Sequence, residues 1–269
     1  DLGPEYAAVS CYNSLKIGGG SHTLNRLNLK EVALASNCTV EQYLNEALPK
    51  YVNLMAELMT ARIKFLVEES NFFNTDWLVR EGLISLDKFS AMFGIYGLAE
   101  AVNILMERAG EAGTYGHSAV ADDLGYKITS KVAELVAQIE MPFCEGNGGR
   151  AFMHSQSGID LDLEVTAGTR IPVGTEPDLF SHLKTVARHH HLFASGISDV
   201  LSFDETAVNN PQAVVDVIRG AFEAGMRDFT FNLDSNDFIR ITGYLVRKSD
   251  LAKMPEARHS STKLGAGSV

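Results

Sequence analysis

The spacing of hydrophobic residues along the chain predicts alternating strands and helices. A short apolar strand, Ala7–Tyr12, runs into a tract of three glycines, and a second extended apolar segment follows at Leu27–Leu34. A long amphipathic helix is expected to open at Thr39, because Thr39 and Gln42 have the spacing of a capping box. Pro49 lies inside this helix, where a proline can kink the backbone.

Four further helices and one strand follow from the same reasoning. Apolar spacing and terminal residues predict helices over Gly97–Arg108 ended by Gly110, over 124–139, from Glu176-Pro177 with Gly196 as C-cap, and from Asn210-Pro211 to Gly225. Phe229, Phe231 and Leu233 alternate with polar residues, as in a half-buried strand. The pattern therefore predicts an α/β fold.

No repeat or low-complexity segment divides the chain before its end. One structural unit is expected over residues 1–254, followed by a C-terminal tail rich in Ser, Gly and Lys over 255–269. The sequence opens with Asp1-Leu2-Gly3-Pro4, without a methionine or a basic and apolar leader, so no signal peptide is expected. The absent methionine favours a sequence that is part of a longer one.

Composition and net charge indicate which kinds of binding partner are to be expected. Hydrophobic residues make up 45% of the 269 residues and charged residues 21%, which favours a folded core over disorder. The net charge of −11 repels phosphate backbones and anionic lipid, so neither nucleic acid nor a membrane surface is expected as a partner. No apolar run approaches the roughly 20 residues of a membrane span. Three cysteines without CxxC spacing argue against disulfides or a zinc ribbon and favour a cytoplasmic protein.

Gly243 lies in the most informative segment of the sequence. The run Asp237–Arg247 places this glycine between β-branched and aromatic residues, where a strand or a tight hairpin is expected. Taken alone, a glycine in that setting indicates a β-bulge or a hairpin turn, because only glycine takes a positive φ without cost.

Cys11 is the second candidate for chemistry. It lies in the run Val9-Ser10-Cys11-Tyr12-Asn13, which precedes the glycine tract and the segment Asn25–Leu29. Taken alone, a free cysteine in such a context indicates a small, buried and inert hydrophobic residue.

Both segments resemble those of the glycyl radical enzymes. Arg240-Ile241-Thr242-Gly243-Tyr244 is similar to the C-terminal glycyl radical motif of that family, although Ser, Cys or Ala is more usual than Thr at the third position. The Cys11 segment resembles the family's cysteine loop and the strand that follows it. The resemblance implies that Gly243 stores an unpaired electron on its α-carbon and that Cys11 forms the thiyl radical that attacks the substrate.

Three other stretches are similar to loops of the anaerobic ribonucleotide reductases: Phe93–Glu100, Glu140–Gly146 and Gly174–Pro177. Ordinary turn chemistry accounts for them equally well.

Departures from the family's patterns limit the reaction. Ser10 stands where pyruvate formate-lyase has a second cysteine, and Asn13 stands where the dehydratases and lyases carry a glutamate base. An amide cannot take a proton as that base does. The C-terminal region also lacks the four cysteines that hold zinc in anaerobic ribonucleotide reductases. The resemblance is therefore nearest to the YjjI-type members, and the sequence does not identify the substrate.

The resemblance implies a ten-stranded α/β barrel of which this chain supplies the C-terminal portion. The Cys11 and Gly243 loops would meet at the centre of this barrel. A radical S-adenosylmethionine activating enzyme would install the radical on Gly243 under anaerobic conditions, and the radical-bearing protein would be sensitive to oxygen. An N-terminal barrel portion would lie on a longer or a separate chain, and the full enzyme would form a homo-oligomer.

Four polar residues are the expected contacts of a small-molecule substrate: Asn13, His22, Glu145 and Glu176. They lie in or beside the segments that resemble active-site loops. No bound metal is expected.

Two other patterns allow competing interpretations. His189–His191 looks like a metal-binding tract, but consecutive helical side chains point about 100° apart, and a helix C-terminus also favours such residues. Gly18–Gly20 could form a nest of N–H groups around an anion, although it lacks the Gly-Lys-Ser/Thr ending of a P-loop. The alternatives to a radical enzyme are therefore a phosphate-binding α/β enzyme and a non-catalytic half-barrel scaffold or regulatory subunit.

Overall fold

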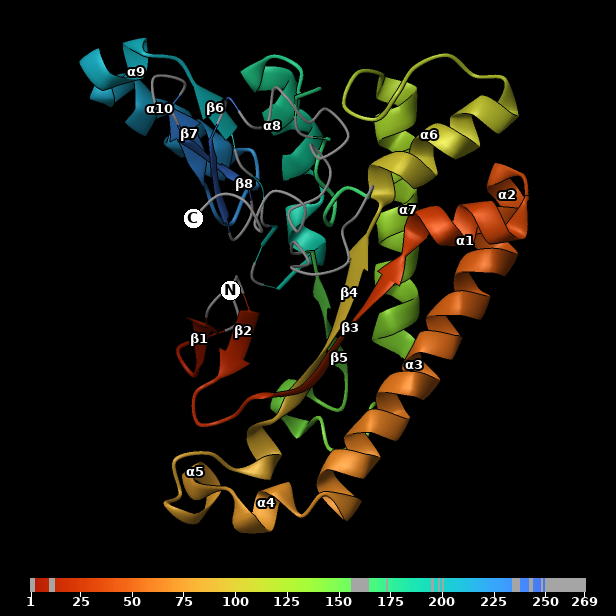
Figure 1. Cartoon of the computed structure of the whole chain (residues 1–269), viewed down its shortest axis with the longest axis vertical. Helices are drawn as coiled ribbons and strands as arrows, with labels where there is room; N and C mark the ends of the chain where they lie inside the picture. Colours follow the sequence, from red (N-terminus) through yellow and green to blue (C-terminus); the bar gives the residue numbers. More distant parts are fainter. Residues whose placement is uncertain are drawn as a thin grey trace.

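A three-stranded parallel sheet is the centre of the structure (Figure 1). The computed structural model describes residues 3–9, 13–155, 165–172, 174–194, 196–197, 199, 201–233, 238–241, 244–247 and 249. Strands β3 (Ser21–Asn28), β4 (Ser90–Tyr96) and β5 (Ala151–His154) pair in that order, and both pairings are parallel. The predicted α/β fold is confirmed.

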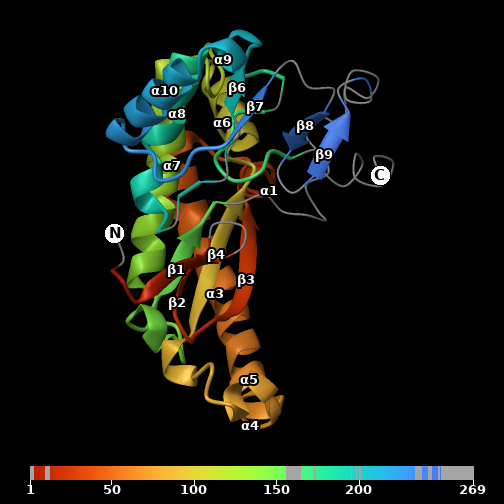
Figure 2. The same cartoon turned by 90° about the vertical axis from the view of Figure 1, so that its left-hand side faces the viewer.

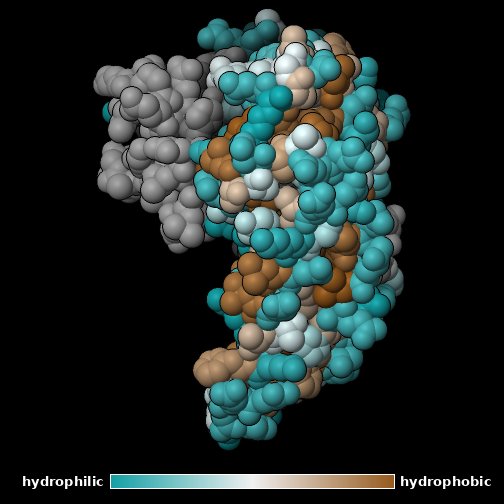
Figure 3. Space-filling view, turned by 90° about the vertical axis from the view of Figure 1, so that its right-hand side faces the viewer, coloured by the Kyte–Doolittle hydropathy of each residue, from teal (hydrophilic) through white to brown (hydrophobic). Residues whose placement is uncertain are grey.

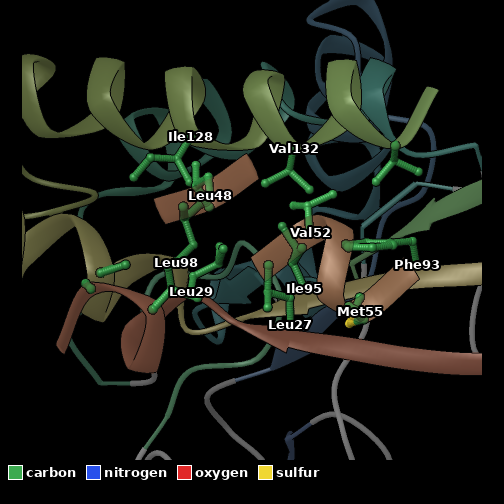
Figure 4. Close-up of a cluster of buried hydrophobic side chains, with 14 of the residues drawn as sticks. Leu27, Leu29, Leu48, Val52, Met55, Phe93, Ile95, Leu98, Ile128 and Val132 are labelled. Carbon is green, nitrogen blue, oxygen red and sulfur yellow. The ribbon is translucent and has the colours of Figure 1, made fainter. Parts of the chain in front are cut away.

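Two long helices, α3 (Leu48–Lys64) and α7 (Ala119–Gln138), cover one face of this sheet. Their buried side chains meet those of alternate strand residues, and Figure 4 shows Leu27 and Phe93 on the same side as Val132 of α7. Because successive side chains of a strand point to opposite faces, the residues between these face away from the helices. We call that second side the open face of the sheet.

The long helix begins where the sequence predicts. Thr39 caps α2 (Val40–Gln42) with a complete capping box, since its hydroxyl accepts from the Gln42 N–H and the Gln42 side chain accepts from the Thr39 N–H. A π-helical turn, η1 (Tyr43–Ala47), connects α2 to α3. Pro49 falls in the first turn of α3, so the helix changes its hydrogen-bonding register at the proline and continues.

The extended segment predicted over Leu27–Leu34 is wrong from Leu29 onward. Strand β3 ends at Asn28, and helix α1 (Leu29–Ser36) follows directly. The Asn28 side chain accepts from the Glu31 N–H, which supplies an N-cap inside an otherwise apolar run.

The helix predicted from Glu176-Pro177 to Gly196 is shorter. Helix α8 (Leu179–Ala187) begins after Asp178, whose carboxylate accepts from two backbone N–H groups of the first turn. It ends well before Gly196, because the chain then turns inward and buries the side chains of His189 and His190.

The other predicted helices are present, although α7 begins at Ala119, ahead of the predicted residue 124. Helix α6 (Leu98–Ala109) lies between Gly97 and Gly110, which have φ of 75° and 69°. Helix α10 (Pro211–Glu223) is capped by the Asn210 side chain. The remaining elements of this part are η2 (Phe65–Glu69), α4 (Phe72–Thr75), α5 (Trp77–Arg80), η3 (Leu86–Lys88), η4 (Glu145–Asn147), η5 (His190–Leu192), α9 (Thr206–Asn209) and the parallel pair β6 (Leu201–Phe203) and β7 (Phe231–Leu233).

The outer surface of the helical layer is mostly hydrophilic, with separate hydrophobic patches (Figure 3). Large exposed hydrophobic residues on α1 and α3 include Leu34, Leu54 and Leu58. Strand β3 is an edge of the described sheet, and its Leu24 is 43% exposed. No described helix is both long enough and apolar enough to cross a membrane.

Candidate functional site

Cys11 separates the two strands of a β-hairpin. Strand β1 (Tyr6–Val9) pairs antiparallel with β2 (Asn13–Lys16). Residues 10–12, which include Cys11, lie outside the described residues. Asn13 is the first residue of β2 and pairs with Val9, so this predicted substrate contact follows the cysteine segment directly.

Gly243 has a corresponding place in a second hairpin. Strand β8 (Phe238–Ile241) pairs antiparallel with β9 (Tyr244–Arg247), and Ile241 lies opposite Tyr244. Residues 242–243, which include Gly243, lie outside the described residues. The two strands of the hairpin expected around this glycine are therefore present.

The β1–β2 hairpin lies on the open face of the sheet (Figure 2). Its Tyr6 hydroxyl donates to the Gly146 carbonyl at 2.7 Å, and the Tyr6 ring packs edge-on against Phe152 of β5 with 6.2 Å between ring centres. Strand β8 lies against β7 and on the same side of the sheet in Figure 1. Both candidate radical positions therefore belong to hairpins on the side that α3 and α7 leave uncovered.

The polar side chains of the open face include Arg26 on β3, Tyr96 on β4 and His154 on β5. The Arg26 guanidinium carbon lies 5.2 Å from the centre of the Tyr96 ring, a cation–π contact. His154 is only 4% exposed. None of these three residues was among the site residues predicted from the sequence. Their alternation with hydrophobic residues of the helix-facing side was the signal that could have found them.

His22 and Glu145, two of the predicted substrate contacts, lie near each other at the amino-terminal end of the sheet. The His22 Nε2–H donates to the Phe143 carbonyl at 2.6 Å, and the ring lies 4.9 Å from that of Phe89. Burial lowers the pKa of His22, against the opposing effects of the Phe143 carbonyl and the Glu145 carboxylate. Glu145 is exposed.

Glu176 lies apart from that pair. Its carboxylate accepts from the Gly174 N–H at 2.6 Å, in the segment that leads into α8. The neighbouring Thr175 carbonyl accepts from His117, in the connection between α6 and α7, which places this segment beyond the carboxyl ends of the strands. The structure thus brings together His22 and Glu145 and holds Glu176 at the other end of the sheet.

A buried ionic cluster fixes α8 to the segment after it. The Asp199 carboxylate accepts from His182 Nε2–H at 2.9 Å and lies 3.4 Å from Arg170 Nε, and all three side chains are almost completely buried. Burial disfavours the charged imidazole, but the Asp199 carboxylate outweighs it and raises the pKa of His182.

Asp228 and His190 adjoin this cluster. His190 Nδ1 accepts from the Arg227 N–H at 3.1 Å and lies 3.9 Å from the Asp228 carboxylate. Burial, reinforced by the Asp199 carboxylate, raises the pKa of Asp228 to about 7. Burial also lowers the pKa of His190 to about 4, so this imidazole is neutral at ordinary pH.

The three consecutive histidines point to different partners. His189 lies in a buried hydrogen-bonded chain, with Nδ1 2.9 Å from the Thr129 hydroxyl and Nε2 3.1 Å from the Tyr115 hydroxyl. Burial lowers the pKa of His189 to about 3. His191 lies 3.3 Å from the Tyr126 hydroxyl. Within the described ranges, no three His, Cys, Asp or Glu side chains are grouped to hold a metal ion.

The glycine tract has a packing role. A Cβ on Gly20 would lie 2.8 Å from the Phe89 ring, and one on Gly19 would overlap the Lys88 carbonyl. Gly146 approaches the Lys88 carbonyl equally closely. The glycines therefore allow two segments, the glycine tract and the turn at Gly146, to pack against residues 88–89, which accounts for them without an anion-binding nest.

Solved structures place this architecture among the glycyl radical enzymes. An anaerobic ribonucleotide reductase superimposes with a TM-score of 0.71 at 15% identity, over 92% of this chain and 44% of that one. A glycyl radical enzyme from Archaeoglobus fulgidus gives a TM-score of 0.65 at 12% identity, over 96% of this chain and 46% of that one. The fold is that of about half of a glycyl radical enzyme α/β barrel.

Sequence similarity then defines the family. The model of the family described as "Glycyl radical enzyme YjjI-like" matches residues 1–269. The uncharacterized protein YjjI of Escherichia coli (strain K12) is 48% identical over 97% of this chain. The chain belongs to the YjjI-like glycyl radical enzyme family. It spans about half the length of the curated relatives it matches.

Proposed function

We propose that the protein is the C-terminal catalytic portion of a radical enzyme in which Gly243 stores the radical and Cys11 delivers it to substrate. A radical S-adenosylmethionine activating enzyme removes one hydrogen atom from the Gly243 α-carbon and leaves one unpaired electron there. Glycine suits this role because a side chain would crowd the planar radical centre. The observation that carries the proposal is that Cys11 and Gly243 each lie between the two strands of a hairpin, on the side of the sheet that α3 and α7 leave uncovered.

The reaction proceeds by transfer of hydrogen atoms. The Cys11 S–H bond breaks as the Gly243 α-carbon regains a C–H bond, and the unpaired electron passes to sulfur. The thiyl radical then takes a hydrogen atom from a carbon of a small organic substrate, which reforms S–H and makes a substrate radical. After the substrate radical has rearranged or eliminated, the product radical takes the hydrogen atom back from Cys11. Asn13 cannot serve as a proton acceptor in this cycle.

Two features support a second polypeptide portion that completes the barrel. The chain spans about half of its relatives, and β3 forms an unpaired edge of the described sheet. An unpaired edge strand is a template for pairing with another strand. We expect this portion, on the same or a separate chain, to cover the open face, and we expect the full enzyme to be a cytoplasmic homo-oligomer. A stable, folded monomer of these 269 residues in size-exclusion chromatography would contradict the need for that portion.

Exchange with solvent deuterium tests the radical relay without knowledge of the substrate. The enzyme is purified anaerobically from its native host after activation, and its electron paramagnetic resonance spectrum is followed in H₂O and D₂O. The remaining α-hydrogen of a Gly243 radical should split the signal into a doublet. Because the Cys11 thiol exchanges its hydrogen with solvent, the relay should replace that α-hydrogen by deuterium and collapse the doublet in D₂O.

Three variants separate the steps of this experiment. Gly243→Ala should give no such radical. Cys11→Ala should form the radical but keep its doublet in D₂O, whereas Cys38→Ala, on the helical side of the molecule, should behave as the unmodified enzyme does. Collapse of the doublet in Cys11→Ala would refute the role of Cys11. A radical that never exchanges in the unmodified enzyme would favour the scaffold alternative.

Oxygen provides a second test of Gly243. Exposure of the activated enzyme to air should cleave the backbone at Gly243 and release the fragment that follows it. The fragment is detected by mass spectrometry, and Gly243→Ala should remain intact under the same treatment. Cleavage at another residue in both proteins would contradict the assignment.

A further inference from the structure

Helix α3 is hydrophobic on two opposite faces. Its inner face packs into the core through residues such as Val52 and Met55 (Figure 4). Its outer face carries three large hydrophobic side chains, Leu54, Leu58 and Phe65, which are 56%, 52% and 58% exposed. The outer face of a surface helix is normally polar, and a helix that is apolar all round is normally buried. The composition of α3 is therefore that of a helix covered on both faces.

The exposed apolar residues of α3 form one continuous row. Leu54, Leu58, Ala61 and Phe65 are all exposed and follow one another at steps of four, three and four residues. We call these four residues the α3 stripe. Alternating steps of three and four keep side chains on one side of a helix, as in the seam between two paired helices. At 1.5 Å per residue the stripe is about 17 Å long, whereas exposed hydrophobic residues that need no explanation are scattered singly.

Two opposite charges flank the α3 stripe on the same side. With about 100° of rotation for each residue, Glu57 and Lys64 both lie beside the stripe on one flank of the helix. Both are exposed, and neither forms an ion pair with another described residue. The other flank carries Arg62, whose Nε–H already donates to the Thr23 hydroxyl at 3.0 Å. The charges beside the stripe that have no partner within the described ranges are thus one acid and one base on a single flank.

These two charges complement each other across a two-fold axis. When two copies of a helix pair antiparallel about such an axis, each flank faces the same flank of the other copy. With Leu58 of each copy against Ala61 of the other, Glu57 of each copy faces Lys64 of the other, and the ion pair forms twice. Parallel helices would instead bring Glu57 to the flank of Arg62, which is already bonded to Thr23. The stripe is therefore complementary to itself in the antiparallel arrangement.

We propose that the α3 stripe is the surface through which two copies of the enzyme associate, with their α3 helices antiparallel and Glu57 of each copy paired with Lys64 of the other. The proposed function places the further barrel portion on the open face, so the outer face of α3, on the other side of the sheet, stays available to a second copy (Figure 3). The inference names the surface of the homo-oligomer expected above and rests on the proposed function in that respect alone. Two helices in contact over this length bury less than the roughly 800 Å² per partner of a standard interface, so the dimer should dissociate on dilution.

Sedimentation velocity of the complete enzyme tests this surface. The unactivated enzyme is purified from its native host, and its sedimentation coefficient is measured over a series of dilutions, which gives the dissociation constant of the dimer. Leu58→Glu places a charge at the centre of the stripe and should raise that constant tenfold or more. Val215→Glu is the matched control, because Val215 is similarly exposed on α10, well apart from α3 in Figure 1. This variant should dimerise as the unmodified enzyme does.

Exchange of the two charges tests the antiparallel pairing. Glu57→Lys and Lys64→Glu should each weaken the dimer severalfold, because each brings like charges together at two places, and the double exchange should restore it. Both positions are exposed, and circular dichroism shows that each variant is folded. A double exchange that leaves the dimer as weak as the single variants do would overturn the pairing.

Two other results would overturn the inference as a whole. One is an unmodified enzyme that is monomeric at every concentration. The other is a dissociation constant that Leu58→Glu leaves unchanged, and a lower thermal midpoint of that variant would then show that another portion of the same polypeptide covers the stripe. Gly243→Ala should still dimerise, so a failure of the radical mechanism would be recognised separately.

Discussion

Replacing Asp228 by asparagine should stabilise the protein at pH 8 and have little effect near pH 4. The Asp228 side chain is 15% exposed, and its Oδ2 is buried without a hydrogen-bond partner among the described residues. A Cβ on Gly196 would lie 2.5 Å from this oxygen, so the carboxyl group fills the space beside that glycine. Burial and the nearby Asp199 carboxylate raise the pKa of Asp228 from 3.8 to about 7, against the opposing hydrogen bond of the Ile197 backbone.

The direction of this pH dependence follows from the raised pKa, because the folded protein binds the Asp228 proton more tightly than the unfolded chain does. Below about pH 4 the carboxyl group is protonated in both the folded and the unfolded protein, so its stabilising contribution is fully present. Between about pH 4 and 7 the unfolded chain loses the proton first, and the contribution declines as pH rises through the folded pKa of about 7. At 1.36 kcal/mol for each pKa unit, the loss is on the order of 2–4 kcal/mol. Because asparagine does not ionise, the variant does not lose stability in this way as the pH rises.

Urea unfolding of the enzyme and its variant at pH 5, 6, 7 and 8 measures the effect. The free energy of unfolding of Asp228→Asn, relative to that of the unmodified enzyme, should rise by on the order of 2–4 kcal/mol between pH 5 and 8. Asp216→Asn is the control, because Asp216 is exposed on α10 and pairs with exposed neighbours such as Arg219. A difference between enzyme and Asp228→Asn that stays constant over this range would refute the reasoning.

Two smaller predictions concern the backbone. Gly146→Ala should destabilise the protein by about 1–3 kcal/mol, because its Cβ would overlap the Lys88 carbonyl, whereas Gly220→Ala should stabilise it by about 0.5–1 kcal/mol, because this position inside α10 has free space around it. Denaturant midpoints that move in the same direction for both variants would contradict this. Thr39→Ala should cost about 1 kcal/mol in the same measurement through loss of the capping box, and Thr39→Ser should restore most of it.

The sequence predicted the elements whose ends are set by local contacts. These elements are α2, capped by Thr39, α6, which lies between two glycines, and α10, capped by Asn210. In each case the contacts at the helix end are made within four residues of the capping residue. Such contacts are visible in a linear pattern. The resemblance of the Cys11 and Gly243 segments was sufficient for the family, because the spacing within each motif is also local.

Contacts between residues far apart in the sequence could not be predicted from such local patterns. The inward turn after α8 depends on His189 meeting Thr129, which is 60 residues earlier. Arg26, Gly94 and His154 lie in one row across the sheet only because three strands, separated by long helical connections, pair in one register. A shift of one residue in either pairing would move a side chain to the helical face. No spacing in the sequence fixes that register.

The requirements of the fold and of the proposed chemistry coincide on the open face. Parallel sheets are stable when both faces are covered, and here α3 and α7 cover only one face of β3–β5. The second face carries the hairpin around Cys11, the exposed edge at Leu24 and the buried His154. A barrel portion that covered this face would complete the sheet and would also exclude water and oxidants from the Gly243 radical. One packing event would therefore serve both the stability of the sheet and the lifetime of the proposed radical.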